Sequence, residues 1–267
     1  MMKIAAPLLP LENAFDPASS GRKAANLALL AGAGLRVPRG FVIPAAAPEE
    51  AWVPALPAAF AALGARFAAV RSSSPSEDGA VKSFAGQFDS FLGVGAGRLE
   101  EAVRGCLTSA AGARAAAYGG TAGAMAVIVQ EMVEPEASGV AFSCDPVSGD
   151  RGRIVIEAVY GLCEPLVSGK ITPDHYELDR GAFGLRTSLV ARQAEFLAAA
   201  PAGGTRYLPV PTEKAAAPKL GEGGLRLVGE AAARAEELLG APADIEWALA
   251  GGELYLLQAR PVTGLGD

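Results

Sequence analysis

The sequence predicts an α+β fold with two lobes and largely antiparallel sheets. Helical and strand-like segments follow one another without a regular strand–helix alternation, which argues against a parallel sheet. Two pairs of strand-like segments are each joined by a short turn, which is typical of hairpins. A length of 267 residues is enough for one large domain or two small lobes.

The first half of the chain is predicted to hold both helices and strands, in no regular order. Residues 23–33 place apolar side chains on every side of a helix, and Gly32 and Gly34 lie at its end. This is typical of a buried helix that stops at a glycine. The other predicted segments are a turn into a strand at 37–43, a loop and short helix at 45–63, a strand at 67–71 that runs into a polar loop at 72–83, a helix at 98–118 and an apolar strand at 125–133.

The second half is predicted to hold two hairpins. Segments 139–143 and 153–159 flank the turn sequence DPVSGD, so we interpret them as the first hairpin. Residues 196–224 are rich in Ala, Pro and Gly and predict a mobile loop. A helix at 225–239, which ends at Gly240, then precedes the second hairpin, with strands 244–249 and 253–258 around Gly251-Gly252.

Composition excludes several classes of protein. The net charge is −6 and the pI is about 5.0, which argues against a nucleic-acid binder that works through a basic field. We find no apolar stretch of the length of a membrane span and no signal-peptide pattern at the start. Three widely spaced cysteines argue against a disulfide framework. We therefore expect a cytoplasmic protein that binds neither nucleic acid nor membrane.

Two polar segments of the first half are suited to phosphate. Lys23 follows a glycine turn at a helix start, where charge and backbone N–H groups can hold an anion. Arg71 ends a strand and leads into a hydroxyl-rich loop, and Gly86 and Ser90 lie in a small-residue segment that can cover a triphosphate. Taken alone, the first segment is better explained as a solvated lysine and the second as an ordinary surface turn.

A third segment, Gln130-Glu131-Met132-Val133, lies at the end of the apolar strand. Extended backbone at this point can offer N–H and C=O groups to the edge of an adenine. The alternative is a strand that simply leaves the core.

A fourth segment pairs acidic residues with an amide and an arginine. Asp244 and Glu246 are two apart on a strand and so share one face. If Gln258 and Arg260 return to that face, the set provides oxygen ligands for Mg²⁺ and a cation for phosphate. The alternative is a solvent-facing hairpin.

The hairpin register decides between these interpretations. A two-residue turn at Gly251-Gly252 in a regular hairpin places Glu246 and Gln258 on opposite faces. A loop of three or five residues pairs Asp244 with Gln258 and brings all four polar residues to one face. The magnesium hypothesis therefore predicts a loop of odd length.

Taken in order, these segments resemble the nucleotide-binding domain of the phosphoenolpyruvate synthase and pyruvate phosphate dikinase family, to which rifampicin phosphotransferase also belongs. The resemblance extends from residue 21 to residue 263. It rests on the following stretches: GRKAANL, VPRGFVI, AVRSSSPSED, SFAGQFDSFLGV, VIVQEMVEPEASGVAFSCDP, IVIEAVYGLCEPLVSGKITPDHYEL and DIEWALAGGELYLLQARPVT.

The resemblance implies an ATP-grasp-type fold that holds ATP and Mg²⁺ between two lobes. We place the N-terminal lobe at residues 1–124 and the C-terminal lobe, with the adenine-side strand and the magnesium hairpin, at 125–267. By position, the implied roles are phosphate binding and transfer for Lys23, Arg71 and Arg260, nucleotide binding for Gly86, Ser90, Gln130, Glu131 and Val133, and magnesium binding for Asp244, Glu246 and Gln258.

The sequence departs from the family pattern at three places. Ser90 stands where the family usually has threonine, which keeps the hydroxyl, and Cys163 replaces a glycine, where we expect a buried apolar cysteine. The stretch between residues 94 and 127 is short for the family. The single histidine, His175, lies inside the nucleotide domain, where the family has no carrier histidine, and we expect it to have a packing or surface role.

The resemblance implies transfer of phosphoryl from ATP to a histidine, with AMP as the final nucleotide. Because we assign His175 no such role, we expect the acceptor histidine on a separate partner protein. One alternative is a self-contained ATP-grasp kinase or ligase that acts directly on a small molecule. Another is a nucleotide-binding regulatory module, although the retained charged residues argue against it.

Overall fold

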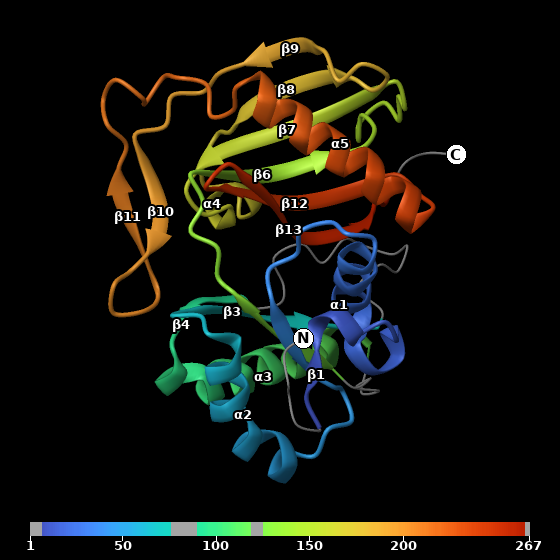
Figure 1. Ribbon diagram of the computed structural model, residues 1–267, viewed down its shortest axis with the longest axis vertical. Coiled ribbons are helices and arrows are strands. Elements are labelled where there is room, and N and C mark those ends of the chain that lie inside the picture. Colours follow the sequence, from blue (N-terminus) through green and yellow to red (C-terminus); the bar gives the residue numbers. More distant parts are fainter. Residues whose placement is uncertain (1–6, 76–89, 119–124, 265–267) are drawn as a thin grey trace. The chain divides into compact units, whose positions relative to one another are not determined.

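The computed structural model describes residues 7–75, 90–118 and 125–264 (Figure 1). The chain divides into two compact units. The first takes Met1–Gly32, Pro38–Met132 and Ala199–Thr205, and the second takes Ala33–Val37, Val133–Ala198 and Arg206–Asp267. Sheets in both units are antiparallel and helices pack on them, so the predicted α+β class is confirmed.

The first unit is built on a five-stranded sheet in the order β1-β2-β5-β3-β4. The five strands are β1 (Leu9–Pro10), β2 (Gly40–Ile43), β3 (Ala68–Ser73), β4 (Ser90–Val94) and β5 (Ala126–Glu131). The helices are α1 (Pro17–Gly32), α2 (Glu49–Leu63) and α3 (Leu99–Tyr118), and two short 3₁₀ turns are η1 (Leu11–Asn13) and η2 (Ala96–Arg98).

The two faces of this sheet are covered by different helices. Helices α2 and α3 contribute Trp52, Phe60 and Val103 to a core that includes Val70 and Val129 of the sheet. The backbone N–H of Ala24 in α1 instead meets the Ser73 hydroxyl. Since side chains alternate along a strand, α1 lies on the face of the odd-numbered residues of β3, opposite to α2 and α3.

The second unit is built on a six-stranded sheet in the order β13-β12-β6-β7-β8-β9, with a separate pair β10-β11. The strands are β6 (Ala137–Phe142), β7 (Arg153–Tyr160), β8 (Asp174–Asp179), β9 (Leu185–Leu189), β10 (Glu195–Ala199), β11 (Thr205–Pro209), β12 (Ala243–Ala250) and β13 (Glu253–Pro261). The short α4 (Glu164–Val167) follows β7, and α5 (Glu222–Leu239) lies across one face of the sheet (Figure 1).

Both predicted hairpins are confirmed, as β6-β7 and β12-β13. The expectation of a loop at 196–224 is wrong for part of that range, because β10 and β11 lie within it and α5 starts at Glu222. Strands β8 and β9 were not predicted. In β8 the inward positions are Asp174, Tyr176 and Leu178, so an aspartate at a buried position masked the alternation of apolar and polar residues that indicates a strand.

The boundary predicted between residues 124 and 125 differs from the division of the structure, which comes after Met132. The reason is the place of β5 in the sheet. It pairs with β2 on one side and with β3 on the other, so the predicted adenine-side strand is the centre of the first unit. Its continuous apolar sequence is that of a strand buried on both faces.

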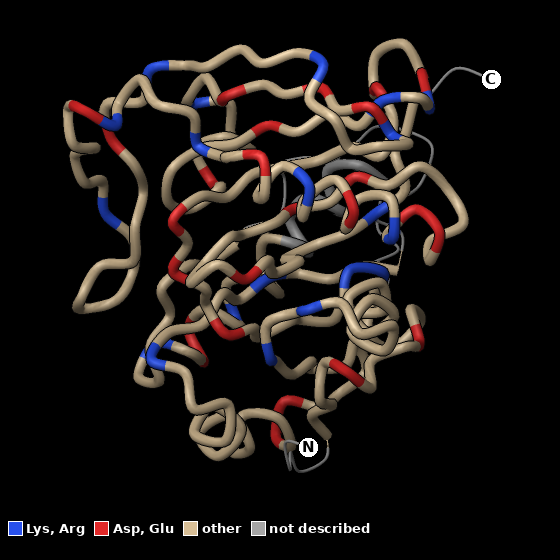
Figure 2. Tube along the Cα trace, turned by 45° about the horizontal axis from the view of Figure 1, so that its top comes forward, with Lys and Arg blue, Asp and Glu red and all other residues tan. Residues whose placement is uncertain are grey.

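Basic and acidic residues are interspersed along the described chain (Figure 2). Many form exposed pairs, such as Arg104 with Glu49 and Glu100 at 2.7 and 2.9 Å, and such pairs each contribute little to stability. Within the described residues, no helix combines the length and apolar character needed to cross a membrane.

Candidate functional site

The Gly21–Lys23 turn lies against the segment that follows β3. Gly21 has a φ of 75° within α1 and kinks the helix there, and a side chain at this position would overlap Ser73. The Arg22 N–H donates to the Ser74 carbonyl at 3.0 Å, and Lys23 Nζ donates to the Ser72 carbonyl at 3.4 Å. The two segments predicted to bind phosphate are therefore adjacent.

The strand register brings three more predicted residues to one face of the first sheet. Arg71 lies opposite Ile128 on β5 and opposite Ser90 on β4. Gln130 is two residues from Ile128, so its side chain points to the same face. This is the face of Ser73 and helix α1. Lys23, Arg71, Ser90 and Gln130 thus belong to one side of the first unit.

Gln130 and Glu131 point to opposite faces of this sheet. Gln130 is 2% exposed and its Nε2 donates to the Pro38 carbonyl at 3.3 Å. The Glu131 carboxylate accepts hydrogen bonds from Nε and Nη2 of Arg39, at 3.1 and 3.4 Å. Its own N–H donates to the Arg39 carbonyl at 2.7 Å. The side chain and N–H of Glu131 are therefore both used within the fold.

The linker after β5 holds the last predicted nucleotide residue. The Met132 N–H donates to the Phe67 carbonyl at 3.1 Å, and Val133 follows as a half-buried residue outside the strand. Gly86 lies outside the described residues. Of the predicted covering segment, only Ser90 is described, as an exposed residue at the start of β4.

The β12-β13 hairpin corrects the predicted register. The turn is the two-residue Gly251-Gly252, with φ values of 59° and 76° and with Ala250 opposite Glu253. Two positive φ values are typical of a type I′ turn. The odd-length loop that the magnesium hypothesis predicted is therefore wrong, and so is the pairing of Asp244 with Gln258.

A β-bulge nevertheless brings the four polar residues to one face. The register shifts between Glu246 and Trp247, because Trp247 lies opposite Leu256 whereas Glu246 lies opposite Gln258. Leu257 is thus the extra residue of the bulge, which is a recognised way to re-aim side chains in a sheet. Asp244 then lies opposite Arg260, and all four side chains share the face opposite to Ile245 and Trp247.

Burial makes this group electrostatically demanding. Asp244 is 9% exposed and Gln258 is 8% exposed. Arg260 holds Asp244 Oδ2 with Nε and Nη2, both at 2.8 Å. Burial raises the pKa of the Asp244 carboxyl, the arginine acts in the opposite direction, and the charge of Glu246 raises it further. A cation placed beside the two carboxylates would relieve this repulsion.

The donor set fits magnesium. Two carboxylates and one amide oxygen are hard ligands, and Mg²⁺ in nucleotide sites is usually held by one or two carboxylates together with phosphates. Among the described residues, no group of three or more His, Cys, Asp or Glu side chains is arranged to hold a metal ion. The residues present therefore suit a magnesium ion that shares its ligands with a nucleotide rather than an all-protein cage.

Two other predicted residues lie away from this group. Cys163 is 9% exposed and packs with Val159 and Leu166, so the expected buried cysteine is confirmed. His175 lies on β8 with Nδ1 4.0 Å from Glu157 and Nε2 3.7 Å from Glu177. Its side chain is 32% exposed, which is compatible with the surface role that we expected.

Sequence reasoning missed Arg39 as a site residue. It lies in the VPRGFVI segment, one of the stretches that carry the resemblance. A signal was present, because Gly40 follows it: a Cβ at Gly40 would lie 2.7 Å from the Val129 carbonyl oxygen. A glycine required by close strand contact indicates that the neighbouring arginine lies beside β5.

Comparison with known proteins shows the family of the chain. The family model of the pyruvate phosphate dikinase AMP/ATP-binding domain matches residues 53–267. Similar curated proteins are the prodigiosin synthesizing transferase PigC of Serratia marcescens (38% identical), a rifampicin phosphotransferase of Streptomyces sviceus (40%) and a probable phosphoenolpyruvate synthase of Methanothermobacter thermautotrophicus (38%).

These matches cover 73%, 81% and 75% of this chain, but only 22%, 26% and 30% of the respective relatives. The chain thus spans between a fifth and a third of the length of these proteins. The chain belongs to the family of the pyruvate phosphate dikinase AMP/ATP-binding domain.

Proposed function

We propose that this chain is the ATP- and Mg²⁺-dependent component of a phosphotransferase of the phosphoenolpyruvate synthase and pyruvate phosphate dikinase kind. The observation that carries the proposal is the bulged hairpin, which sets Glu246 opposite Gln258 and Asp244 opposite Arg260. A hairpin without function has no need to bury a carboxylate and an amide, Asp244 and Gln258, on the face that also carries Glu246 and Arg260. Membership of a family named for AMP and ATP binding supports the same assignment.

Phosphoryl transfer asks mainly for positioning and charge neutralisation from a protein. We assign phosphate binding to Lys23, Arg71 and Arg260, and magnesium binding to Asp244, Glu246 and Gln258. Ser90 and Gly86 would cover the phosphates. The Glu131 carbonyl, the Val133 backbone and the Gln130 side chain would form the adenine side. Magnesium, when bound, would neutralise negative charge on the phosphates as the transferred group separates.

We further propose that the phosphoryl group passes to a histidine on a partner protein. His175 is poorly suited to accept it. His175 shares a sheet face with Glu246 through the pairings Glu246–Val140, Val140–Glu157 and Glu157–His175. Three strand spacings separate them, or about 14 Å, and the Glu157 and Glu177 carboxylates beside the imidazole would repel a phosphate.

Analysis of nucleotide products tests this proposal. The purified chain is incubated with ATP and Mg²⁺, alone and with a cell extract, and ADP and AMP are separated. AMP that appears only with extract supports a dikinase-type reaction, in which ATP, histidine and water give phosphohistidine, AMP and phosphate. ADP formed with a small molecule would instead support a direct kinase or ligase. Absence of both products would contradict the proposed activity.

A control variant makes the assay specific. Glu246→Gln removes the negative charge of one proposed magnesium ligand while keeping the size of the side chain. We expect it to lose at least about 100-fold in product formation, in line with the loss of a group that stabilises transition-state charge. Equal rates in both proteins would mean that the nucleotide is processed elsewhere or by a contaminant.

A further inference from the structure

Residues 199–205 form the tip of the β10-β11 hairpin and belong to the first compact unit, although the rest of both strands belongs to the second. The tip is closed by two backbone hydrogen bonds: Gly203 N–H to the Ala200 carbonyl and Ala200 N–H to the Gly204 carbonyl, each 2.9 Å. Such a defined tip, with contacts of its own in the first unit, is more than a passive turn between two strands.

The tip contacts β4 and the start of β3. The Gly204 N–H donates to the Gly93 carbonyl at 2.8 Å, and any side chain at Gly93 would overlap the Gly204 backbone. Arg66 Nη2 donates to the Pro201 carbonyl at 2.7 Å, and its guanidinium lies 5.0 Å from the centre of the Phe67 ring. The tip is therefore held by backbone complementarity and by one arginine.

The same contacts reach the ends of the strands that carry the predicted nucleotide residues. The Gly93 N–H donates to Met132 Sδ at 3.0 Å, and the Met132 N–H donates to the Phe67 carbonyl at 3.1 Å. Phe67 directly precedes β3, which carries Arg71. Met132 lies between the adenine-side residues Glu131 and Val133. Gly93 is three residues after Ser90 in β4.

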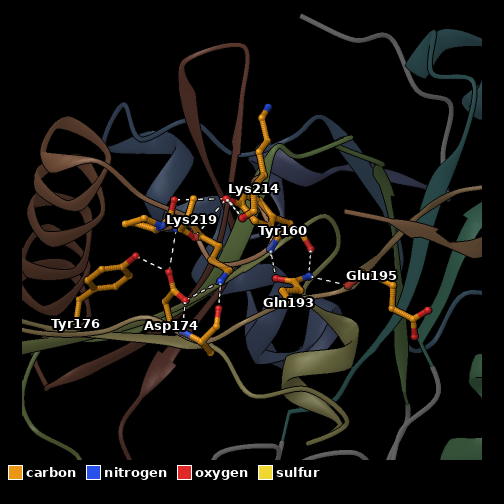
Figure 3. Close-up of polar contacts among 10 residues, drawn as sticks. Tyr160, Asp174, Tyr176, Gln193, Glu195, Lys214 and Lys219 are labelled. Atoms are coloured by element: carbon orange, nitrogen blue, oxygen red, sulfur yellow. Dashed lines mark hydrogen bonds and ion pairs between the residues drawn. The ribbon is translucent and has the colours of Figure 1, made fainter. Parts of the chain in front are cut away.

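The base of the hairpin is fixed by a buried polar network (Figure 3). Asp174 accepts the N–H of Ala191, which precedes the hairpin, at 2.8 Å. It also accepts the N–H of Lys219, which follows the hairpin, at 2.9 Å. Lys219 Nζ also donates to Asp174 at 2.8 Å, with both side chains fully buried. Figure 3 shows Asp174 between Lys219 and Tyr176, whose hydroxyl donates to it at 2.7 Å.

A second contact fixes the entering strand. Gln193 acts as a strand partner for Tyr160: its Oε1 accepts the Tyr160 N–H at 2.8 Å and its Nε2 donates to the Tyr160 carbonyl at 3.1 Å (Figure 3). The Leu162 N–H then donates to the Leu197 carbonyl at 2.8 Å. The segment from Tyr160 to Asp174, which carries part of the family resemblance, thus serves to hold this hairpin.

We propose that residues 199–205 are a positioning element for the nucleotide-binding residues of the first unit. The Asp174–Lys219 network holds the base of the hairpin whose tip these residues form. The tip ties together the ends of β3, β4 and β5, and so sets the spacing among Arg71, Ser90 and the adenine-side backbone. This inference rests on the proposed function, because it gives the hairpin a role in the affinity for ATP.

Three variants test this role. The first replaces residues 200–204 by Asn-Gly, which closes a two-residue hairpin without the tip. The second is Arg66→Ala, which removes the hydrogen bond to Pro201 and leaves the hairpin intact. The third, Arg206→Ala, is the matched control, because Arg206 is an exposed arginine of the same hairpin. Kd for ATP with Mg²⁺ is measured by calorimetry well below the unfolding temperature.

We expect Kd to rise about tenfold in the shortened hairpin and about threefold in Arg66→Ala, and to stay unchanged in Arg206→Ala. Arg66→Lys, which keeps a donor, should recover most of the affinity. Amide hydrogen exchange should become faster at residues 66–68 and 131–132, and stay unchanged in β6 and β7. A purely structural role would lower the unfolding temperature without this pattern in Kd.

Wild-type affinity in the shortened hairpin would overturn the proposal. If that variant does not fold, equal Kd values for Arg66→Ala and Arg206→Ala overturn it instead. Failure of the proposed function gives a different result, because the wild-type protein then does not bind ATP at all. In that case hydrogen exchange in Arg66→Ala still decides whether the tip holds the strand ends.

Discussion

At the scale of single residues, Asp244 is the group whose chemistry is most altered by the fold. Burial raises its pKa, the paired Arg260 opposes this, and Glu246 adds repulsion. The charged form of this carboxyl is therefore disfavoured by its surroundings, and a bound cation would favour it. This is the pattern of a group selected for binding rather than for stability.

The pH dependence of stability tests this account of Asp244. Its folded-state pKa lies above that of the unfolded chain, so the unfolded chain loses the proton first as pH rises from about 4. Without Mg²⁺ and nucleotide, this group should therefore lower the free energy of unfolding as pH rises through that range. Asp244→Asn should remove this contribution, as measured by urea unfolding at several pH values. Parallel curves for the two proteins would contradict the assignment.

Arg39 offers a second prediction at the residue scale. Its ion pair with Glu131 is exposed, at 60% and 34% for the two side chains, so Arg39→Ala should change the free energy of unfolding by less than about 1 kcal/mol. Because the pair fixes the end of β5, Kd for ATP should rise about threefold. Glu131→Gln should have a similar effect, and the double variant should add little. Additive effects of the two changes would rule out a shared role.

Residue types and spacing in the sequence were enough to identify the candidate residues, but not their contacts. The prediction grouped Gln130, Glu131 and Val133 as one adenine-side set. The alternation of side chains along β5 sends Glu131 to the face opposite to Gln130, where Arg39 binds it. That partner lies 92 residues away in the sequence, and the pairing follows from the register of the sheet.

At the scale of elements, one extra residue in β13 decides whether the proposed magnesium ligands Glu246 and Gln258 lie on the same face of the sheet. With a two-residue turn and no bulge, Glu246 and Gln258 would lie on opposite faces, as the sequence predicts for a regular hairpin. The bulge at Leu257 restores a shared face. Turn length could be inferred from Gly251-Gly252, but a bulge has no comparable sequence signal, which is why the predicted register was wrong.

Two single-residue deletions test the bulge. Deleting Leu257 gives a regular hairpin in which Gln258 still lies opposite Glu246 and Arg260 still lies opposite Asp244. Deleting Ala259 forces either Gln258 or Arg260 to the buried face. We expect Mg²⁺-dependent ATP binding to survive the first deletion and to be lost in the second, with circular dichroism as the check on folding. Similar binding in both deletion variants would contradict the register argument.

The Asp174–Lys219 pair gives a second prediction at this scale. Lys219→Met leaves a fully buried carboxylate without its cation, and should cost about 3–5 kcal/mol in the free energy of unfolding. Adding Asp174→Asn should recover part of that loss, because it removes the buried charge. Lys214→Met, an exposed lysine of the same segment, should change stability by less than about 0.5 kcal/mol. Urea unfolding measures the free energy of unfolding of all three variants. A small loss of stability in Lys219→Met would show that the pair is not essential to the base of the hairpin.

At the scale of the whole molecule, the class of fold and most elements could be predicted, but the division into units could not. Each unit includes a short piece from the other half of the chain. Residues Ala33–Val37 join the second unit, where the Arg36 carbonyl accepts the Leu256 N–H at 2.9 Å, and Ala199–Thr205 join the first. Such exchanges depend on long-range backbone pairing, which local sequence patterns do not encode.

The central proposal is that Arg71 and Glu246 both take part in an ATP-dependent reaction, and ATP binding measures it most directly. Calorimetric titration of ATP in the presence of Mg²⁺ is carried out on the wild-type protein, on Arg71→Ala from the first unit and on Glu246→Ala from the second. The account predicts that the wild type binds and that each variant weakens binding at least about tenfold, since each loses a charged contact to phosphate or magnesium. Wild-type affinity in either variant would show that its unit does not take part and would contradict the account.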